Sequence, residues 1–78
     1  MKILDESRLL RDIELHVTDA EAARLIDSVA DCRRDLAEVG MSESHWHVGD
    51  GQSQVTIYVY ATVEELEAEV VDRLSEGE

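Results

Sequence analysis

Two histidines separated by one residue, His45 and His47, are the side chains best placed to bind a metal ion. On a β-strand they would lie on one face about 7 Å apart. That spacing can chelate zinc, but a zinc site needs at least a third protein ligand. The third candidate, His16, would lie two strands away, roughly 9–10 Å across the sheet, with Tyr58 and Tyr60 between. The sequence therefore predicts no metal site and no cofactor, and a polar sheet face at these positions.

Serines close to His45 raise the question of acyl-transfer chemistry, which needs a nucleophile, a base, an orienting group and oxyanion donors held together. Ser44 and His45 are adjacent, and adjacent residues on a strand point to opposite faces. The Gly-Asp-Gly sequence at 49–51 is typical of a turn, because no helix follows it and no lysine is placed to bind phosphate. We therefore predict no catalytic residue and a protein that is not an enzyme.

The elements that would position these side chains begin with a strand over residues 9–17, which end in a clean alternation from Ile13 to Val17. Its apolar residues alternate with polar ones, which predicts a half-buried strand with Ile13, Leu15 and Val17 on one face. Residues 2–4 could add a short strand that turns back onto residues 9–13.

A long helix is predicted next. Thr18 and Glu21 have the spacing of a capping box, and Gly40 has the place of a glycine that ends a helix. Apolar residues recur between them at spacings of three and four, which predicts one buried stripe along about six turns: Ala22, Leu25, Val29, Cys32, Leu36 and Val39.

A hairpin and a second helix complete the chain. Residues 44–48 and 54–61 alternate as strands on either side of the Gly-Asp-Gly turn. Thr62 and Glu65 form a second possible capping box, and the apolar spacing that follows predicts a helix over residues 63–75.

The order β-α-β-β-α predicts an α+β fold in a single domain, residues 1–78. A right-handed crossover makes the first two strands parallel, and the hairpin makes the third antiparallel to the second. We expect a three-stranded sheet in the order 1-3-2, as in a truncated ferredoxin-like fold. Two helices would cover one face, as a two-layer sandwich, and the first strand would have a free edge.

The composition excludes several classes of protein. The 78 residues include 19 acidic and seven basic side chains, a formal charge of −12. Direct nucleic-acid binding is not expected, because phosphate contacts need clustered lysine and arginine. No apolar run is long enough to span a membrane, and the first twelve residues lack the apolar core of a signal peptide. Cys32, the single cysteine, is expected to be a buried apolar residue, and the protein is expected in the cytoplasm.

The acidity is concentrated at the C-terminal end, where residues 62–78 carry a net charge of −6. This surface could bind a basic protein partner, be merely solvated, or reflect adaptation of the host to salt. The position of Trp46 is also open, since a shift of one residue would move it from the core to an interface. The residues predicted to bind a partner come from the acidic helix and the histidine and tyrosine sheet face: Glu64, Glu65, Glu67, Glu69, Asp72, Tyr58, Tyr60, His45, His47 and His16.

The run from Glu14 to Leu25, which joins the first strand, the capping box and the first helix, resembles small α+β immunity proteins of bacterial polymorphic-toxin systems. The strand containing His45-Trp46-His47-Val48 and the strand over 55–60 add to the likeness, which covers roughly residues 13–74. The resemblance implies a cytoplasmic protein that binds and blocks a cognate toxin, often a basic nuclease, and it implies no catalytic residues.

The sequence thus favours a non-enzymatic acidic protein that binds a basic protein partner, such as an immunity-type or antagonist protein, and that forms a homodimer through its free sheet edge. The alternative is a homodimeric domain that binds a small ligand or a metal on the histidine and tyrosine face.

Overall fold

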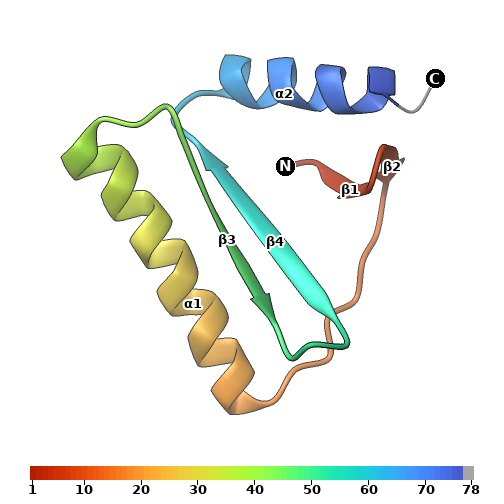
Figure 1. The fold of residues 1–78 in the computed structure, drawn as a ribbon, viewed down its shortest axis with the longest axis vertical. Helices are drawn as coiled ribbons and strands as arrows, with labels where there is room; N and C mark the ends of the chain where they lie inside the picture. Colours follow the sequence, from red (N-terminus) through yellow and green to blue (C-terminus); the bar gives the residue numbers. More distant parts are fainter. Residues whose placement is uncertain (77–78) are drawn as a thin grey trace.

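The computed structural model of the protein describes residues 1–76 and shows an open α+β arrangement (Figure 1). Residues 77–78 lie outside it, so Glu78 and the end of the predicted 1–78 domain are not described. The described elements, in chain order, are β1 (Ile3–Asp5), β2 (Arg8–Leu10), α1 (Asp19–Arg34), the π-helical turn η1 (Asp35–Val39), β3 (Glu43–Gly49), β4 (Gln54–Tyr60) and α2 (Val63–Glu76).

The hairpin β3–β4 confirms the two strands and the turn predicted for this region. Val48 pairs with Val55, Trp46 with Ile57 and Ser44 with Val59, so these residues share one face. In the turn, the Asp50 carboxylate accepts hydrogen bonds from the backbone N–H groups of Gln52 and Ser53, both at 2.9 Å. These two bonds lower the pKa of Asp50. Gly51 has a φ of 92°, which a residue without Cβ adopts at little cost.

Helix α1 begins where the sequence predicts, but it ends at Arg34, and a π-helical turn continues the predicted helix as far as Gly40. The Thr18 hydroxyl accepts from the Glu21 N–H, and the Glu21 carboxylate accepts from the Thr18 N–H, which completes the capping box. Cys32 is 1% exposed on the face toward the hairpin, as predicted. After Arg34 the backbone widens into the turn η1, and Gly40 ends it with a left-handed φ of 79°.

Thr18→Ala is expected to lower the free energy of unfolding by about 1 kcal/mol, because the two hydrogen bonds of the Thr18 hydroxyl, from the Glu21 N–H and to the Glu21 carboxylate, are lost. Thr62→Ala is the matched control. At the start of α2 only the Glu65 N–H to Thr62 hydroxyl half of a capping box is present, at 3.2 Å. Urea unfolding of both variants tests this. An equal loss in both, or a larger loss for Thr62→Ala, would contradict the expected difference between the caps.

The predicted three-stranded sheet in the order 1-3-2 is not formed within residues 1–76. The structure instead has two separate two-stranded antiparallel sheets, β1–β2 and β3–β4. The predicted turn back onto residues 9–13 is present in part, as Ile3 pairs with Leu10. Residues 13–17 are not a strand. Their alternation is correct for one, but a strand also needs a hydrogen-bonded neighbour, and Ile13, Leu15 and Val17 remain 56%, 49% and 45% exposed.

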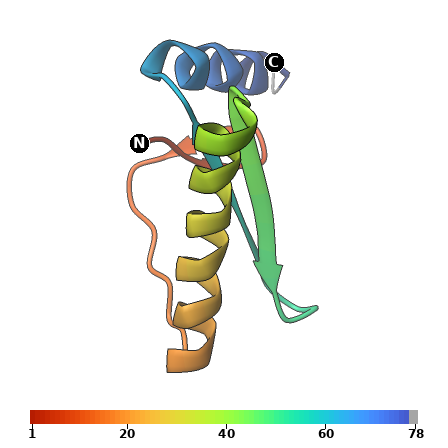
Figure 2. The same cartoon turned by 90° about the vertical axis from the view of Figure 1, so that its left-hand side faces the viewer.

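The two helices do not cover one face of the hairpin, which corrects a second expectation. Helix α1 lies along the face that carries Ser44 and Val48, both buried. Helix α2 crosses the end of the hairpin (Figure 2). It contacts the opposite face, where Arg73 hydrogen-bonds to Tyr58. Because Ala61 and Thr62 alone separate β4 from α2, the chain cannot travel back to the α1 side before the helix begins.

The core is small. Cys32 and Val48 are the buried apolar residues of the described chain, at 1% and 7% exposed. Trp46 faces the α1 side, as the unshifted register predicts, yet it is 52% exposed. No helix within residues 1–76 is both long and apolar enough to cross a bilayer.

Candidate functional site

Four ring side chains form a row on the hairpin face opposite α1. The pairing of His45 with Tyr58 brings their rings together at a centroid distance of 4.8 Å, nearly parallel. Tyr60 continues the row beyond Tyr58 at 6.4 Å, and His47 continues it beyond His45 at 5.4 Å with an edge-to-face contact. This polar face is the one the sequence predicts.

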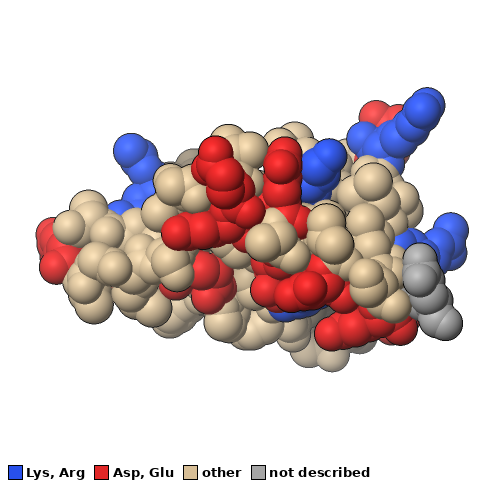
Figure 3. All heavy atoms as spheres, turned by 90° about the horizontal axis from the view of Figure 1, so that it is seen from above, with Lys and Arg blue, Asp and Glu red and all other residues tan. Residues whose placement is uncertain are grey.

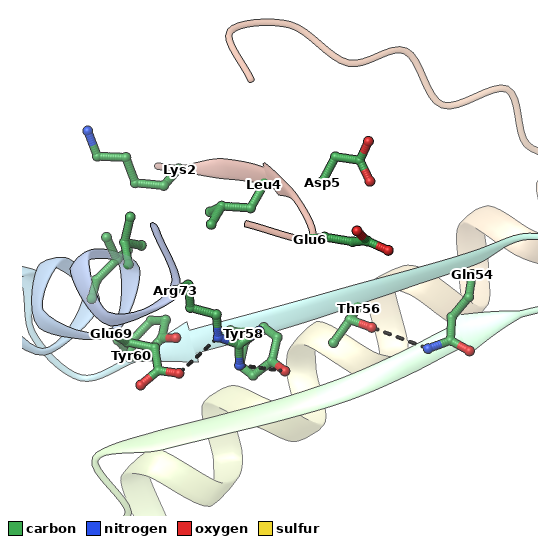
Figure 4. A pocket seen from close by; sticks show the side chains of 12 residues that line it. Lys2, Leu4, Asp5, Glu6, Gln54, Thr56, Tyr58, Tyr60, Glu69 and Arg73 are labelled. Atoms are coloured by element: carbon green, nitrogen blue, oxygen red, sulfur yellow. Dashed lines mark hydrogen bonds and ion pairs between the residues drawn. The ribbon is translucent and has the colours of Figure 1, made fainter. Parts of the chain in front are cut away.

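Helix α2 is attached to this row through Arg73. Its Nη2 donates to the Tyr58 hydroxyl at 3.1 Å, and its Nε donates to the Glu69 carboxylate at 3.0 Å (Figure 4). The guanidinium carbon lies 4.8 Å from the centre of the Tyr58 ring, within the range of a cation–π contact. The hydrogen bonds to Tyr58 and Glu69 raise the pKa of Arg73, which keeps it charged.

Tyr60 lies where α2 begins to cover the row. Partial burial raises the pKa of its hydroxyl, and the nearby carboxylates of Glu69 and Glu43 raise it further, because a phenolate here would be desolvated and repelled. The hydroxyl therefore stays protonated and can donate a hydrogen bond.

Between α2 and the ring row lies a cleft of about 450 Å³, referred to below as the acidic cleft. Its walls combine aromatic rings with carboxylates: Ser42, Glu43, His45, Tyr58, Tyr60, Glu65, Ala68, Glu69, Asp72 and Arg73. Arg73 is the one basic residue among them, apart from the imidazole of His45, and Glu69 and Tyr58 already engage it. The Oε2 atom of Glu65 is buried and has no hydrogen-bond partner.

A second cleft of about 430 Å³ opens on the other side of Tyr58, toward the N-terminal hairpin. Thr56, Tyr58 and Tyr60 of β4 line one side, and Leu4 and Glu6 lie across from them (Figure 4). Leu66 and Val70 of α2 add apolar surface. We refer to this space as the β1–β4 cleft.

The structure brings together six of the ten predicted partner-binding residues, all at the acidic cleft: Glu65, Glu69, Asp72, His45, Tyr58 and Tyr60. Glu64 and Glu67 are exposed on α2 and line neither cleft. His47 lies farther along the hairpin, where its Nδ1 contacts the Thr56 hydroxyl and the Gln54 amide. His16 borders a different cleft, beside the hairpin turn. Seen from the α2 side, carboxylates cover much of the middle of the molecule (Figure 3).

Four residues that line the cleft were not predicted from the sequence, Ser42, Glu43, Ala68 and Arg73, and two of these are charged. Arg73 could have been found, because it is the only basic residue of the second helix and lies four residues after Glu69, the spacing of a helical ion pair. Glu43 contacts the Nδ1 of His45 at 2.8 Å and also faces the cleft. Its role depends on the hairpin register, which places it opposite Tyr60.

The geometry can recognise a cation. Aromatic faces and carboxylates are the groups that bind an arginine or lysine side chain. Within residues 1–76, no group of three or more histidine, cysteine or acidic side chains is arranged to hold a metal ion. Ser44 is buried on the α1 side and donates to Asp35 at 2.9 Å, so it diverges from His45 as expected.

Comparison of the chain with protein-family models, with curated proteins and with solved structures finds no match in any of the three.

Proposed function

We propose that this chain is a non-enzymatic acidic protein that binds and blocks a basic protein partner in the cytoplasm, in the manner of immunity-type or antagonist proteins. The acidic cleft is the binding site. The buried, unpartnered Oε2 of Glu65 is the observation that supports this most. A buried carboxylate oxygen without a donor is costly, and a rotation of the Glu65 side chain into the cleft would let a partner's arginine or lysine supply that donor while its charge lay against the tyrosine rings.

The exposed carboxylates around the cleft have a different role in this proposal. Glu64 and Glu67 lie on α2 outside the cleft. Charges at the rim of an interface attract an oppositely charged partner over a distance of about 10 Å and raise the association rate, whereas buried anchors set the dissociation rate. Glu64 and Glu67 therefore raise the association rate of the partner, and the residues of the cleft set how long the partner stays bound.

The double variant Glu64→Lys with Glu67→Lys is expected to slow association by about tenfold and to flatten its dependence on salt. The fold should be unchanged, since both side chains are exposed. The partner is first recovered from the native host with the wild-type protein as bait, and association is then measured at two ionic strengths. Unchanged kinetics with every recovered partner would show that the acidic helix is only a solvated surface.

The small-ligand or metal-binding alternative has less support in the geometry. His45 and His47 could offer a metal only two ligands, their Nε2 atoms, because each Nδ1 is already hydrogen-bonded, His45 to Glu43 and His47 to Thr56. His16, which would be the third ligand, borders a cleft that neither of the other two lines.

A further inference from the structure

The outer edge of β4 presents unpaired backbone groups. At the two ends of the hairpin, the Asp50 N–H donates to the Ser53 carbonyl and the Ala61 N–H donates to the Ser42 carbonyl. Hydrogen-bonded pairs alternate in an antiparallel ladder, so Val55, Ile57 and Val59 point their N–H and C=O groups toward β3. Those of Gln54, Thr56, Tyr58 and Tyr60 point away from β3. Within residues 1–76, no other strand pairs with this edge.

The sequence of β4 is that of a central strand. Residues 51–63 contain no charged side chain, in a chain of which 33% is charged. Natural edge strands are protected by lysine, proline, bulges or inward charges, and none of these occurs in Gln54–Tyr60. The other edge of the hairpin differs, because β3 carries Glu43, His45 and His47 at its outward positions.

Two clefts lie beside this edge. The β1–β4 cleft separates β4 from Leu4 and Glu6, and a cleft of about 290 Å³ separates Val55 from Leu15 and Val17 on the other side. The N-terminal hairpin and the segment that follows it thus lie to the side of β4 without pairing with it (Figure 1).

We propose that a second copy of this chain occupies the free edge, with the two β4 strands antiparallel across a twofold axis in the sheet order β3-β4-β4-β3. With Ile57 on the axis, the outward backbone N–H and C=O groups of all four residues form hydrogen bonds across the interface. Thr56 then pairs with the partner's Tyr58, and Gln54 pairs with the partner's Tyr60. An isolated two-stranded hairpin is at best marginally stable in water, whereas a sheet of three or more strands with an apolar face can be stable on its own. Each chain carries a charge of −12, so contact through most of its surface would place like charges opposite each other. Contact through the neutral strand β4 avoids this repulsion.

Proline substitutions at paired positions test which edge is used. Thr56→Pro removes an outward N–H of β4, and His47→Pro removes one from the outer edge of β3 directly across the hairpin. Sedimentation velocity at micromolar concentration should show a wild-type dimer, at least about tenfold weaker dimerisation for Thr56→Pro, and a retained dimer for His47→Pro. Circular dichroism checks that each variant is folded.

A cross-link tests the register without proline. Residues on the axis in a non-hydrogen-bonded pair have Cα atoms about 4.5 Å apart, within disulfide range. Ile57→Cys should form an interchain disulfide on mild oxidation, whereas Trp46→Cys, its partner on β3, should not. The wild type is the control for Cys32, which is 1% exposed.

The dependence of affinity on salt distinguishes dimerisation from the proposed binding of a basic partner. Dimerisation of two acidic chains should strengthen as salt rises, whereas binding of a basic partner should weaken. Three results would each overturn the dimer: a wild-type monomer at millimolar concentration, a dimer that folded Thr56→Pro leaves intact, or a monomer whose Thr56 and Tyr58 amides resist hydrogen exchange. The last would show that residues 13–17 of the same chain close on the edge.

Discussion

Glu65→Gln is expected to weaken partner binding by about 2 kcal/mol, roughly a 30-fold rise in Kd, mainly through faster dissociation. The substitution keeps the size of the side chain and removes its charge. If the proposed function holds, the Glu65 Oε2, buried and without a donor in the free protein, pairs with a cation of the partner. The loss of a charged hydrogen bond in a desolvated cleft is then larger than the loss of any exposed charge on α2.

The free protein is expected to respond in the opposite direction. A neutral amide in place of a buried, unpartnered carboxylate lowers the desolvation cost, because a charged group costs more to bury than a neutral one. It also removes an acid from the first turn of α2, which costs about 0.3–1 kcal/mol of favourable interaction with the helix dipole. We therefore expect the midpoint of urea unfolding to rise.

Glu64→Gln is the matched control for Glu65→Gln. It removes a charge from the same helical turn, but its side chain is exposed and lies outside the cleft. Its effect on unfolding measures the dipole contribution alone, and its effect on the dissociation rate should be small. Equal dissociation rates in the two variants would show that Glu65 does not contact the partner.

The local elements could be predicted from the sequence because their determinants lie close together in the chain. The capping box of Thr18 and Glu21, the left-handed Gly40 and the turn at Asp50 each involve residues within a few positions of one another. The alternation in β3 and β4 also predicted which side chains share a face, and the strand pairing confirms it.

The sheet order could not be predicted in the same way, because it depends on contacts between distant segments. Residues 13–17 have the alternation of a strand, yet periodicity describes only the faces of a segment and does not provide the neighbour that its backbone must pair with. The side of the hairpin that α2 contacts was predicted wrongly for the same reason. The short connection after Tyr60 and the hydrogen bond from Arg73 to Tyr58 determine it together.

The candidate site was predicted as two separate surfaces, the acidic helix and the ring face. The contact of α2 with the ring face joins them and selects among the acids. Glu65 and Glu69 line the cleft while Glu64 and Glu67 do not. Helical spacing separates these two pairs only when the buried face of α2 is known, and the expected packing on the α1 side gave the wrong face.

Arg73→Met is expected to release α2 from the hairpin and to lower the free energy of unfolding by about 1–2 kcal/mol. Methionine keeps much of the aliphatic length but loses the donor to Tyr58, the ion pair with Glu69 and the charge over the Tyr58 ring. The ion pair contributes little by itself, since both side chains are about 40% exposed. The larger part of the loss comes from the contact with Tyr58 and from the repulsion between the carboxylates of the cleft once their cation is gone.

Arg34→Met is the matched control, because it also removes an arginine from a helical ion pair. Its partner Asp31 lies on the same helix, and the two side chains are 58% and 51% exposed. We expect a loss of no more than about 0.5 kcal/mol.

The free energy of unfolding of Arg73→Lys should lie between those of the wild type and Arg73→Met, since lysine restores the charge without the planar guanidinium that spans Tyr58 and Glu69. Hydrogen exchange should show faster exchange of the α2 amides in Arg73→Met, while those of α1 are unchanged. Unchanged exchange in α2 would mean that Leu66 and Val70 hold the helix against the hairpin, and that Arg73 serves the cleft by its charge alone.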